Sequence, residues 1–145
     1  MLGKRAVWTK KIRANALAAA GDTCEICGVE EVRLICHDKW LYDDDKCTAT
    51  LIGFEIHCGS CDSVTHLGRA IQCGVPQEVF IAAGEHICQV NGVKPSTALS
   101  ILKSSIDLWQ NRNAKRWEVA VSPSLLKAYP ELKELPQFRP AKREY

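Results

Sequence analysis

Two closely spaced cysteine pairs constrain this chain more than any other feature of its sequence. Two residues separate Cys24 from Cys27 and Cys58 from Cys61, and thirty residues lie between the pairs. Each C-x-x-C turn points two sulfur atoms at one ion, and four thiolates match the tetrahedral coordination of zinc. We therefore expect a closed structural zinc site on these four cysteines, with a redox pair or buried free thiols as the alternatives.

The cysteine content also bears on the compartment. The chain has 145 residues, of which 46% are hydrophobic and eight are cysteines. This composition supports a conventional core without disulfide staples, so we expect a reducing, cytoplasmic compartment. The net charge of +2 points to no class of partner. No uncharged apolar run is long enough for a membrane span. Basic residues before Ala14 to Ala20 would suit a signal peptide, but this run is short, Ala-rich and broken by Asn15, so we expect an amphipathic helix instead.

Hydrophobic periodicity and turn residues predict an α+β protein. We expect a helix over 4–20, strands over 32–37 and 48–57 joined by a turn at 43–46, and helices over 62–73, 76–90 and 96–114. Asp62 or Ser63 is expected to cap the helix after the second cysteine pair. The expected organisation is one domain over 1–122, divided into a lead-in helix (1–23), a zinc-bound strand–strand–helix core (24–74) and a helical portion (75–122), followed by a loose, Pro-rich, charged tail (123–145).

Two pairs of polar residues fit hydrolytic chemistry. His37 and Asp38 end the first expected strand, and Asp62 and His66 lie four residues apart, hence on one helix face. A histidine that deprotonates water, opposite a helix that holds a divalent ion, is a workable phosphodiesterase. Each residue also has a structural interpretation, since Asp62 suits a helix cap and single histidines are mostly structural. We expect His57 and His86 to be core or surface residues, and Cys36, Cys47, Cys73 and Cys88 to be buried thiols.

The combined motifs resemble a known family. Four of them occur in order: Cys24-x2-Cys27, LICHDKW over 34–40, Cys58-x2-Cys61, and HLGRA over 66–70. Together they are similar to a zinc-containing branch of the HNH (ββα-metal) endonucleases. The resemblance continues through Val90-Asn91-Gly92 and Trp109-x2-Arg112-x4-Trp117, and so covers most of residues 8–120. It implies a zinc-stapled ββα core, hydrolytic activity on DNA, His37 as general base and His66 as a metal ligand.

The sequence departs from the family pattern at three places. Asp62 stands where members carry a histidine, Asp38 stands where they carry glutamate, and residues 38–57 contain no asparagine. Asp62 can still ligate Mg²⁺ or Mn²⁺, which prefer oxygen. These differences fit either a diverged nuclease or an HNH fold kept for binding.

Two basic clusters extend the nucleic-acid hypothesis. Beside Lys4 and Arg5, the residues that would contact DNA phosphates are Lys10, Lys11, Arg13, Arg69, Arg112, Lys115 and Arg116. Trp117 beside Arg116 could stack on a base, although a place in the core suits an aromatic residue better.

The leading hypothesis is a metal-dependent HNH-type endonuclease that acts on DNA. It needs a structural zinc and a second divalent ion held by Asp62 and His66, with His37 as base and Asp38 assisting. The alternatives are a catalytically degenerate HNH-fold regulator or inhibitor that binds DNA or a protein partner, and a purely structural zinc domain.

Overall fold

The computed structural model describes residues 8–30, 33–134 and 139–140. The chain clusters into two compact units. Unit 1 comprises Met1–Asp22, Cys36–Ile56 and Lys115–Tyr145, and unit 2 comprises Thr23–Ile35 and His57–Ala114. These boundaries cut across the segments expected from the sequence. None of the helices in the described part of the chain combines the length and apolar character that crossing a membrane requires.

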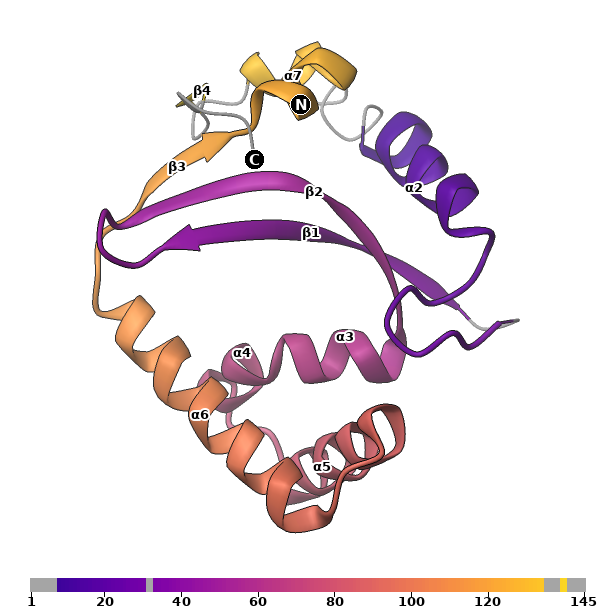
Figure 1. Cartoon of the computed structure of the whole chain (residues 1–145), viewed down its shortest axis with the longest axis vertical. Coiled ribbons are helices and arrows are strands. Elements are labelled where there is room, and N and C mark those ends of the chain that lie inside the picture. Colours follow the sequence, from indigo (N-terminus) through magenta and orange to yellow (C-terminus); the bar gives the residue numbers. More distant parts are fainter. Residues whose placement is uncertain (1–7, 31–32, 135–138, 141–145) are drawn as a thin grey trace. The chain divides into compact units, whose positions relative to one another are not determined.

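Unit 1 is built on a small sheet, which together with the helices confirms the expected α+β class. Strands β1 (Leu34–Asp43) and β2 (Thr48–Cys58) are neighbours joined by a four-residue turn, and so run antiparallel. Strand β3 (Glu118–Val121) pairs with β2 in parallel, and the short β4 (Arg139–Pro140) pairs with β3 (Figure 1). The hairpin expected from the sequence is present, but β1 extends six residues beyond the predicted end at His37. The strand β3 was not predicted.

The strand β2 does not alternate regularly between buried and exposed residues. Three consecutive residues near its start and the last three at its end are buried. Both faces of the strand are therefore covered at these two places, so buried and exposed residues do not alternate there. The start of β2 is paired with β3 through main-chain bonds: Glu118 N–H donates to the Cys47 carbonyl and Ser122 N–H to the Leu51 carbonyl, each at 2.9 Å.

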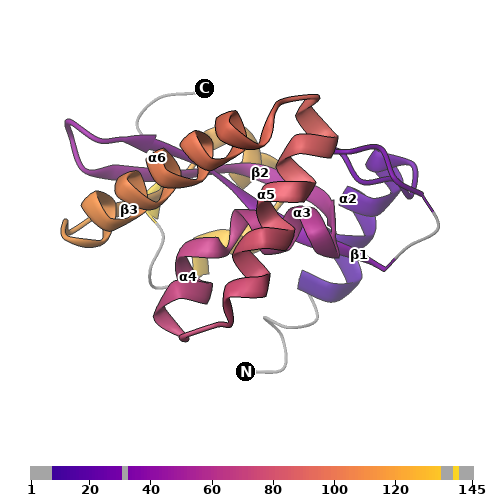
Figure 2. The ribbon, with the colours of Figure 1, turned by 90° about the horizontal axis from the view of Figure 1, so that it is seen from below.

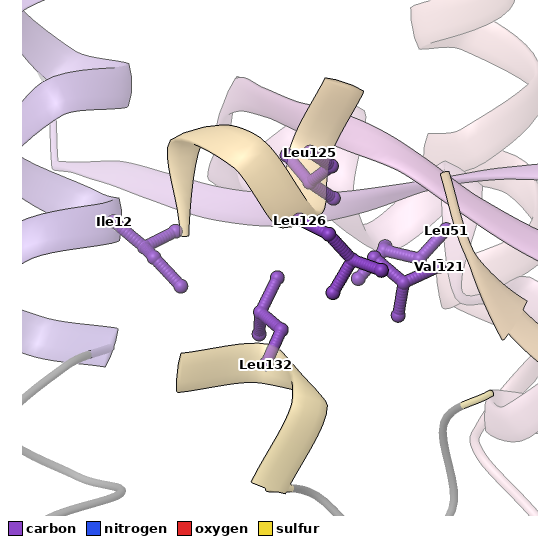
Figure 3. Packing of buried hydrophobic residues seen from close by; sticks show 6 residues of the cluster. All are labelled: Ile12, Leu51, Val121, Leu125, Leu126 and Leu132. Atoms are coloured by element: carbon purple, nitrogen blue, oxygen red, sulfur yellow. The ribbon is translucent and has the colours of Figure 1, made fainter. Parts of the chain in front are cut away.

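The core of unit 1 draws on three distant parts of the chain. The π-helical turn η1 (Trp8–Ile12) leads into α2 (Arg13–Ala20), which ends at Gly21 in the left-handed conformation, as expected for a helix stop. Figure 3 shows the buried cluster, to which Ile12 and residues from β2, β3 and the C-terminal segment contribute: Ile12, Leu51, Val121, Leu125, Leu126 and Leu132.

Residues 123–134 are folded, whereas the prolines of this region suggested a loose extension; of the rest of the expected tail, only 139–140 lie within the described residues. Helix α7 (Pro123–Ala128) begins at Pro123, and the Ser122 hydroxyl caps it by accepting from Leu125 N–H. A 3-10 turn, η2 (Pro130–Glu134), follows. Leu125, Leu126 and Leu132 are buried, so this segment belongs to the core. The prolines start helical turns here, which a composition-based interpretation missed.

Unit 2 is helical apart from the ends of the strands and the segment that carries Cys24 and Cys27. It contains α3 (Gly59–Thr65), α4 (Leu67–Gln72), α5 (Gln77–Asn91) and α6 (Pro95–Asn113). Figure 2 shows α5 and α6 side by side, joined by a short turn that starts at Gly92. The boundaries of α5 and α6 match the predicted ranges within a residue or so. The predicted 62–73 helix instead begins three residues earlier and breaks at His66, so Cys58 rather than Asp62 or Ser63 occupies the cap position.

The core of unit 2 is small. Half-buried hydrophobic residues such as Phe80 pack against a cluster that contains, among the described residues, five buried ones, two of them alanines: Leu67, Ala83, Ile87, Ala98 and Leu102. Leu102 of α6 belongs to this core, whereas Leu99 of the same helix is 53% exposed. A core of this size leaves much of the stability of unit 2 to other interactions.

Gly68 allows α4 to approach α6. A Cβ atom built at Gly68 would lie 2.6 Å from ring atoms of Trp109, whereas one at Gly84 of α5 would meet only Leu102 Cδ1, at 3.6 Å. We expect Gly68→Ala to destabilise the protein by about 1–3 kcal/mol, because the indole must move. Gly84→Ala is the matched control and should be neutral or stabilising by up to about 1 kcal/mol. Denaturant unfolding of both variants measures the difference, and equal midpoints would contradict this account.

Candidate metal centre

The first cysteine pair lies in a tight turn within unit 2. Cys24 N–H donates to the Val29 carbonyl at 3.0 Å, and Gly28 N–H donates to the Cys24 carbonyl at 2.8 Å. Gly28 has φ of +73°, a conformation that favours glycine. The glycine directly after the second cysteine therefore lets the chain fold back, so that Cys24 and Cys27 share one side of the turn.

The second pair joins the end of β2 to the start of α3. Cys58 is the last residue of the strand and is extended (φ −74°, ψ 166°), and Cys61 lies in the first turn of the helix. Cys58 and Cys61 are 6% and 3% exposed, and Cys24 is 1% exposed. The strand-to-helix transition thus points two sulfur atoms inward.

The four sulfur atoms converge. All lie within 4.8 Å of one another, and the Sγ atoms of Cys27 and Cys58 are 3.7 Å apart. A disulfide requires about 2.05 Å, and all eight cysteines are free thiols. A tetrahedral site with metal–sulfur bonds of about 2.3 Å has sulfur–sulfur edges of about 3.8 Å. The donor set therefore fits a metal ion such as zinc, and these four cysteines could hold it.

The electrostatics of the cluster favour a bound cation. Burial raises the pKa of the Cys24 thiol, but backbone hydrogen bonds from Cys27, Cys58 and Ile26 outweigh burial and lower that pKa to about 6. Burial raises the pKa of Cys27, and burial together with the facing thiols raises the pKa of Cys61. Without a cation, thiolates so close together oppose one another's ionisation. A bound cation removes this conflict because its positive charge stabilises all the thiolates at once, so that each ligating thiol is deprotonated.

A histidine absent from the sequence-based site contacts this cluster. The Nε2 atom of His86, on α5, lies 3.1 Å from the Cys61 sulfur. The sequence analysis placed His86 among the core or surface residues and gave it no partner, and the structure adds this contact. No spacing rule could have found it, because 25 residues separate His86 from Cys61.

A second group of possible ligands adjoins the cysteines in unit 2. A ring nitrogen of His57 and a carboxylate oxygen of Asp62 lie within 4.8 Å of each other. The Nε2 atom of His66 is 3.7 Å from the Oδ1 atom of Asp62. The side chains of Asp62 and His66 are 22% and 48% exposed, whereas His57 is only 2% exposed. The predicted proximity of Asp62 and His66 is present, although His66 lies at the break between two helices.

His57 is the residue that the sequence-based interpretation set aside here. It was expected to be an ordinary core or surface histidine, and it is indeed buried, but it lies close to Asp62. Its position directly before Cys58 was the available signal, because any residue beside a C-x-x-C turn is held near whatever that turn binds. A carboxylate and an imidazole are suitable ligands for a divalent transition-metal ion, and the carboxylate also suits Mg²⁺.

His37 and Asp38 lie on β1, in the part of that strand that belongs to unit 1. Consecutive strand residues point to opposite faces. Asp38 Oδ2 accepts a hydrogen bond from Trp40 Nε1, two residues along, and Trp40 packs against the unit 1 core. His37 therefore faces the other way. The assisting role expected for Asp38 stays a prediction, and its carboxylate is engaged by Trp40.

The predicted DNA-contacting residues are divided between the units. Lys10, Lys11, Arg13, Lys115 and Arg116 belong to unit 1, and Arg69 and Arg112 to unit 2. Lys4 and Arg5 lie outside the described residues.

Two of these cations have acidic partners within unit 1. Lys11 Nζ is 2.7 Å from Glu131 Oε1, and Lys115 Nζ is 3.8 Å from Asp44 Oδ1. Trp117 is half-buried and packs edge-on against Tyr42, with ring centroids 5.3 Å apart.

The remaining cysteines are more exposed than expected. Cys36 and Cys88 are half-buried against the cores of units 1 and 2, respectively. Cys47 is half-buried in the turn between β1 and β2, with φ of +50°. Cys73 is exposed, so the prediction that all four are buried thiols is wrong. Cys73 is the residue directly after the end of the short helix α4, and the helical spacing of apolar residues does not predict burial at such an end.

Comparisons of the chain with protein-family models, with curated proteins and with solved structures gave no match.

Proposed function

We propose that this protein is a metal-dependent endonuclease of the HNH type that hydrolyses DNA phosphodiester bonds, with zinc on Cys24, Cys27, Cys58 and Cys61. The observation that carries the proposal is in unit 2. A carboxylate with two imidazoles near it, Asp62 with His57 and His66, directly adjoins a four-thiolate centre. The motif resemblance supplies the rest, because it implies a general base at His37.

In this proposal each residue has one task. The four cysteines fix the end of β2 against α3 and the first turn, which positions His57 and Asp62. The closed thiolate centre has no open coordination position and takes no part in hydrolysis. A divalent ion on Asp62 and its neighbouring imidazoles would supply positive charge to the scissile phosphate and to the leaving oxygen. His37 would accept the proton of the attacking water.

The test is cleavage of supercoiled and linear DNA by folded, zinc-loaded protein with Mg²⁺, Mn²⁺, Ni²⁺ or EDTA. We expect cleavage that depends on an added ion and stops with chelator. Asp62→Asn keeps the shape but removes the charge, and we expect it to lower cleavage by about 10²-fold or more while the zinc content stays unchanged. Ser63→Ala, at the next and exposed position, is the matched control.

The opposite outcome identifies the alternative. If the folded, zinc-loaded protein fails to cleave DNA with every one of these ions, the nuclease proposal is contradicted. It would favour a catalytically inactive HNH-fold regulator that binds DNA or a protein. Asp62 in the family's histidine position and the engagement of Asp38 with Trp40 are the features that suit this alternative.

A further inference from the structure

A loaded four-cysteine centre concentrates negative charge that the ligand side chains, all thiolates, cannot compensate. Four thiolates around one Zn²⁺ carry a net charge of about −2. Three of the four cysteines are 1–6% exposed, so water reaches little of this charge. Buried charge is costly unless hydrogen-bond donors compensate it. A side chain that donates to a ligating sulfur therefore stabilises the loaded centre.

His86 is in position to be such a donor. Its neighbours Ala83 and Ile87 on α5 are 5% and 6% exposed and belong to the unit 2 core. Helix α5 also packs against α3, which carries Cys61 (Figure 2). Core packing thus sets the position of the His86 ring, independently of any bond that the ring makes.

The contact geometry indicates an outer-sphere role. His86 Nε2 lies 3.1 Å from the Cys61 sulfur. Among the described residues, the group of possible ligand atoms at this centre that all lie within 4.8 Å of one another consists of the four sulfurs. His86 is not in that group. The imidazole therefore adjoins one ligand and is not itself part of the tetrahedral set. Because a thiolate only accepts, the tautomer that fits is the one with the proton on Nε2.

We infer that His86 donates an N–H···S hydrogen bond to the Cys61 thiolate, which strengthens zinc retention and protects this sulfur from electrophiles. The inference rests on the zinc centre of the proposed function and not on DNA cleavage. Electron density that a sulfur shares with an N–H donor is less available to attack an outside reagent. Outer-shell donors of this kind typically change metal affinity by ten- to a hundredfold.

The experiment compares four variants as full-length, zinc-loaded proteins. His86→Ala removes the ring, His86→Phe keeps a ring of similar size without a donor, and His86→Gln restores an N–H donor. Gln89→Ala changes an exposed residue of the same helix and is the matched control. Competition with a chromogenic chelator gives the zinc affinity. Treatment with iodoacetamide, in which a sulfur–carbon bond forms and iodide leaves, gives the rate of zinc release.

We expect His86→Ala and His86→Phe to bind zinc about tenfold more weakly than the unmodified protein and to release it correspondingly faster. His86→Gln should recover most of this loss, and Gln89→Ala should show none. In Co²⁺-substituted protein, loss of the donor should move the sulfur-to-metal charge-transfer band to lower energy, which a packing role alone would not do.

The outcomes separate the inference from the proposal beneath it. If the unmodified protein binds no zinc, the proposed metal centre is wrong and the inference falls with it. If it binds one zinc per chain and His86→Phe equals it in affinity, release rate and spectrum, the centre stands and only the role of His86 is overturned.

Discussion

Cys58→Ser is expected to abolish stoichiometric zinc binding and to unfold unit 2 while unit 1 retains its fold. Cys58 is the one ligand that is both the last residue of β2 and the residue that precedes α3. Apparent zinc-binding free energies at structural sites are about 10–16 kcal/mol, as large as the whole stability of a typical domain. The buried cluster of unit 2, with two alanines among its five members, cannot replace such a contribution.

The measurement pairs metal analysis with hydrogen exchange. In Cys58→Ser we expect less than one zinc per chain and loss of amide protection in α5 and α6. Amides of β3 and α7 should stay protected, because the buried cluster around Val121 and Leu126 contains none of the four cysteines. Cys73→Ser makes the same chemical change at an exposed thiol and should leave both zinc and protection intact. Full protection of α5 and α6 in zinc-free protein would contradict the structural role of the centre.

The sequence predicted those features of the fold that depend on residues close together in the chain. Each of these features has a short-range signal. The cysteine pairs have the spacing of metal ligands, and the hairpin has a turn between two segments rich in branched residues. Helices α5 and α6 have apolar residues at helical spacing, and Gly92 ends α5. The α+β class follows from these elements. What spacing cannot determine is which distant element reaches a site, and the approach of His86 to Cys61 is of this kind.

The other misses have physical reasons of the same sort. Strand β3 and helix α7 are four and six residues long, too short for periodicity to distinguish them from a loop. Their stability comes from pairing with β2 and from burial of Leu125 and Leu126, which are tertiary effects. The break at His66 has no local signal in the sequence either.

His37→Ala is expected to lower DNA cleavage by about 10²–10⁴-fold, the usual contribution of a general base, with zinc content and thermal unfolding unchanged. His37 is half-buried on β1 and contributes nothing to the four-cysteine centre in unit 2. The measurement is the rate of plasmid nicking at saturating divalent ion, so that a weakened metal affinity cannot imitate a loss of base. Leu41→Ala, four residues along the same strand face and 37% exposed, is the control for perturbation of β1.

A second arm distinguishes proton transfer from a structural effect of the same substitution. Removal of the His37 ring leaves space that free imidazole can enter, and imidazole in solution carries the same basic nitrogen. We therefore expect added imidazole to restore part of the cleavage by His37→Ala and to leave Asp62→Asn inactive, because imidazole cannot replace a carboxylate ligand. Full cleavage by His37→Ala without imidazole would remove His37 from the mechanism. Recovery of both variants to the same extent would show that imidazole acts on the DNA or the metal, and the base would then have to be sought elsewhere.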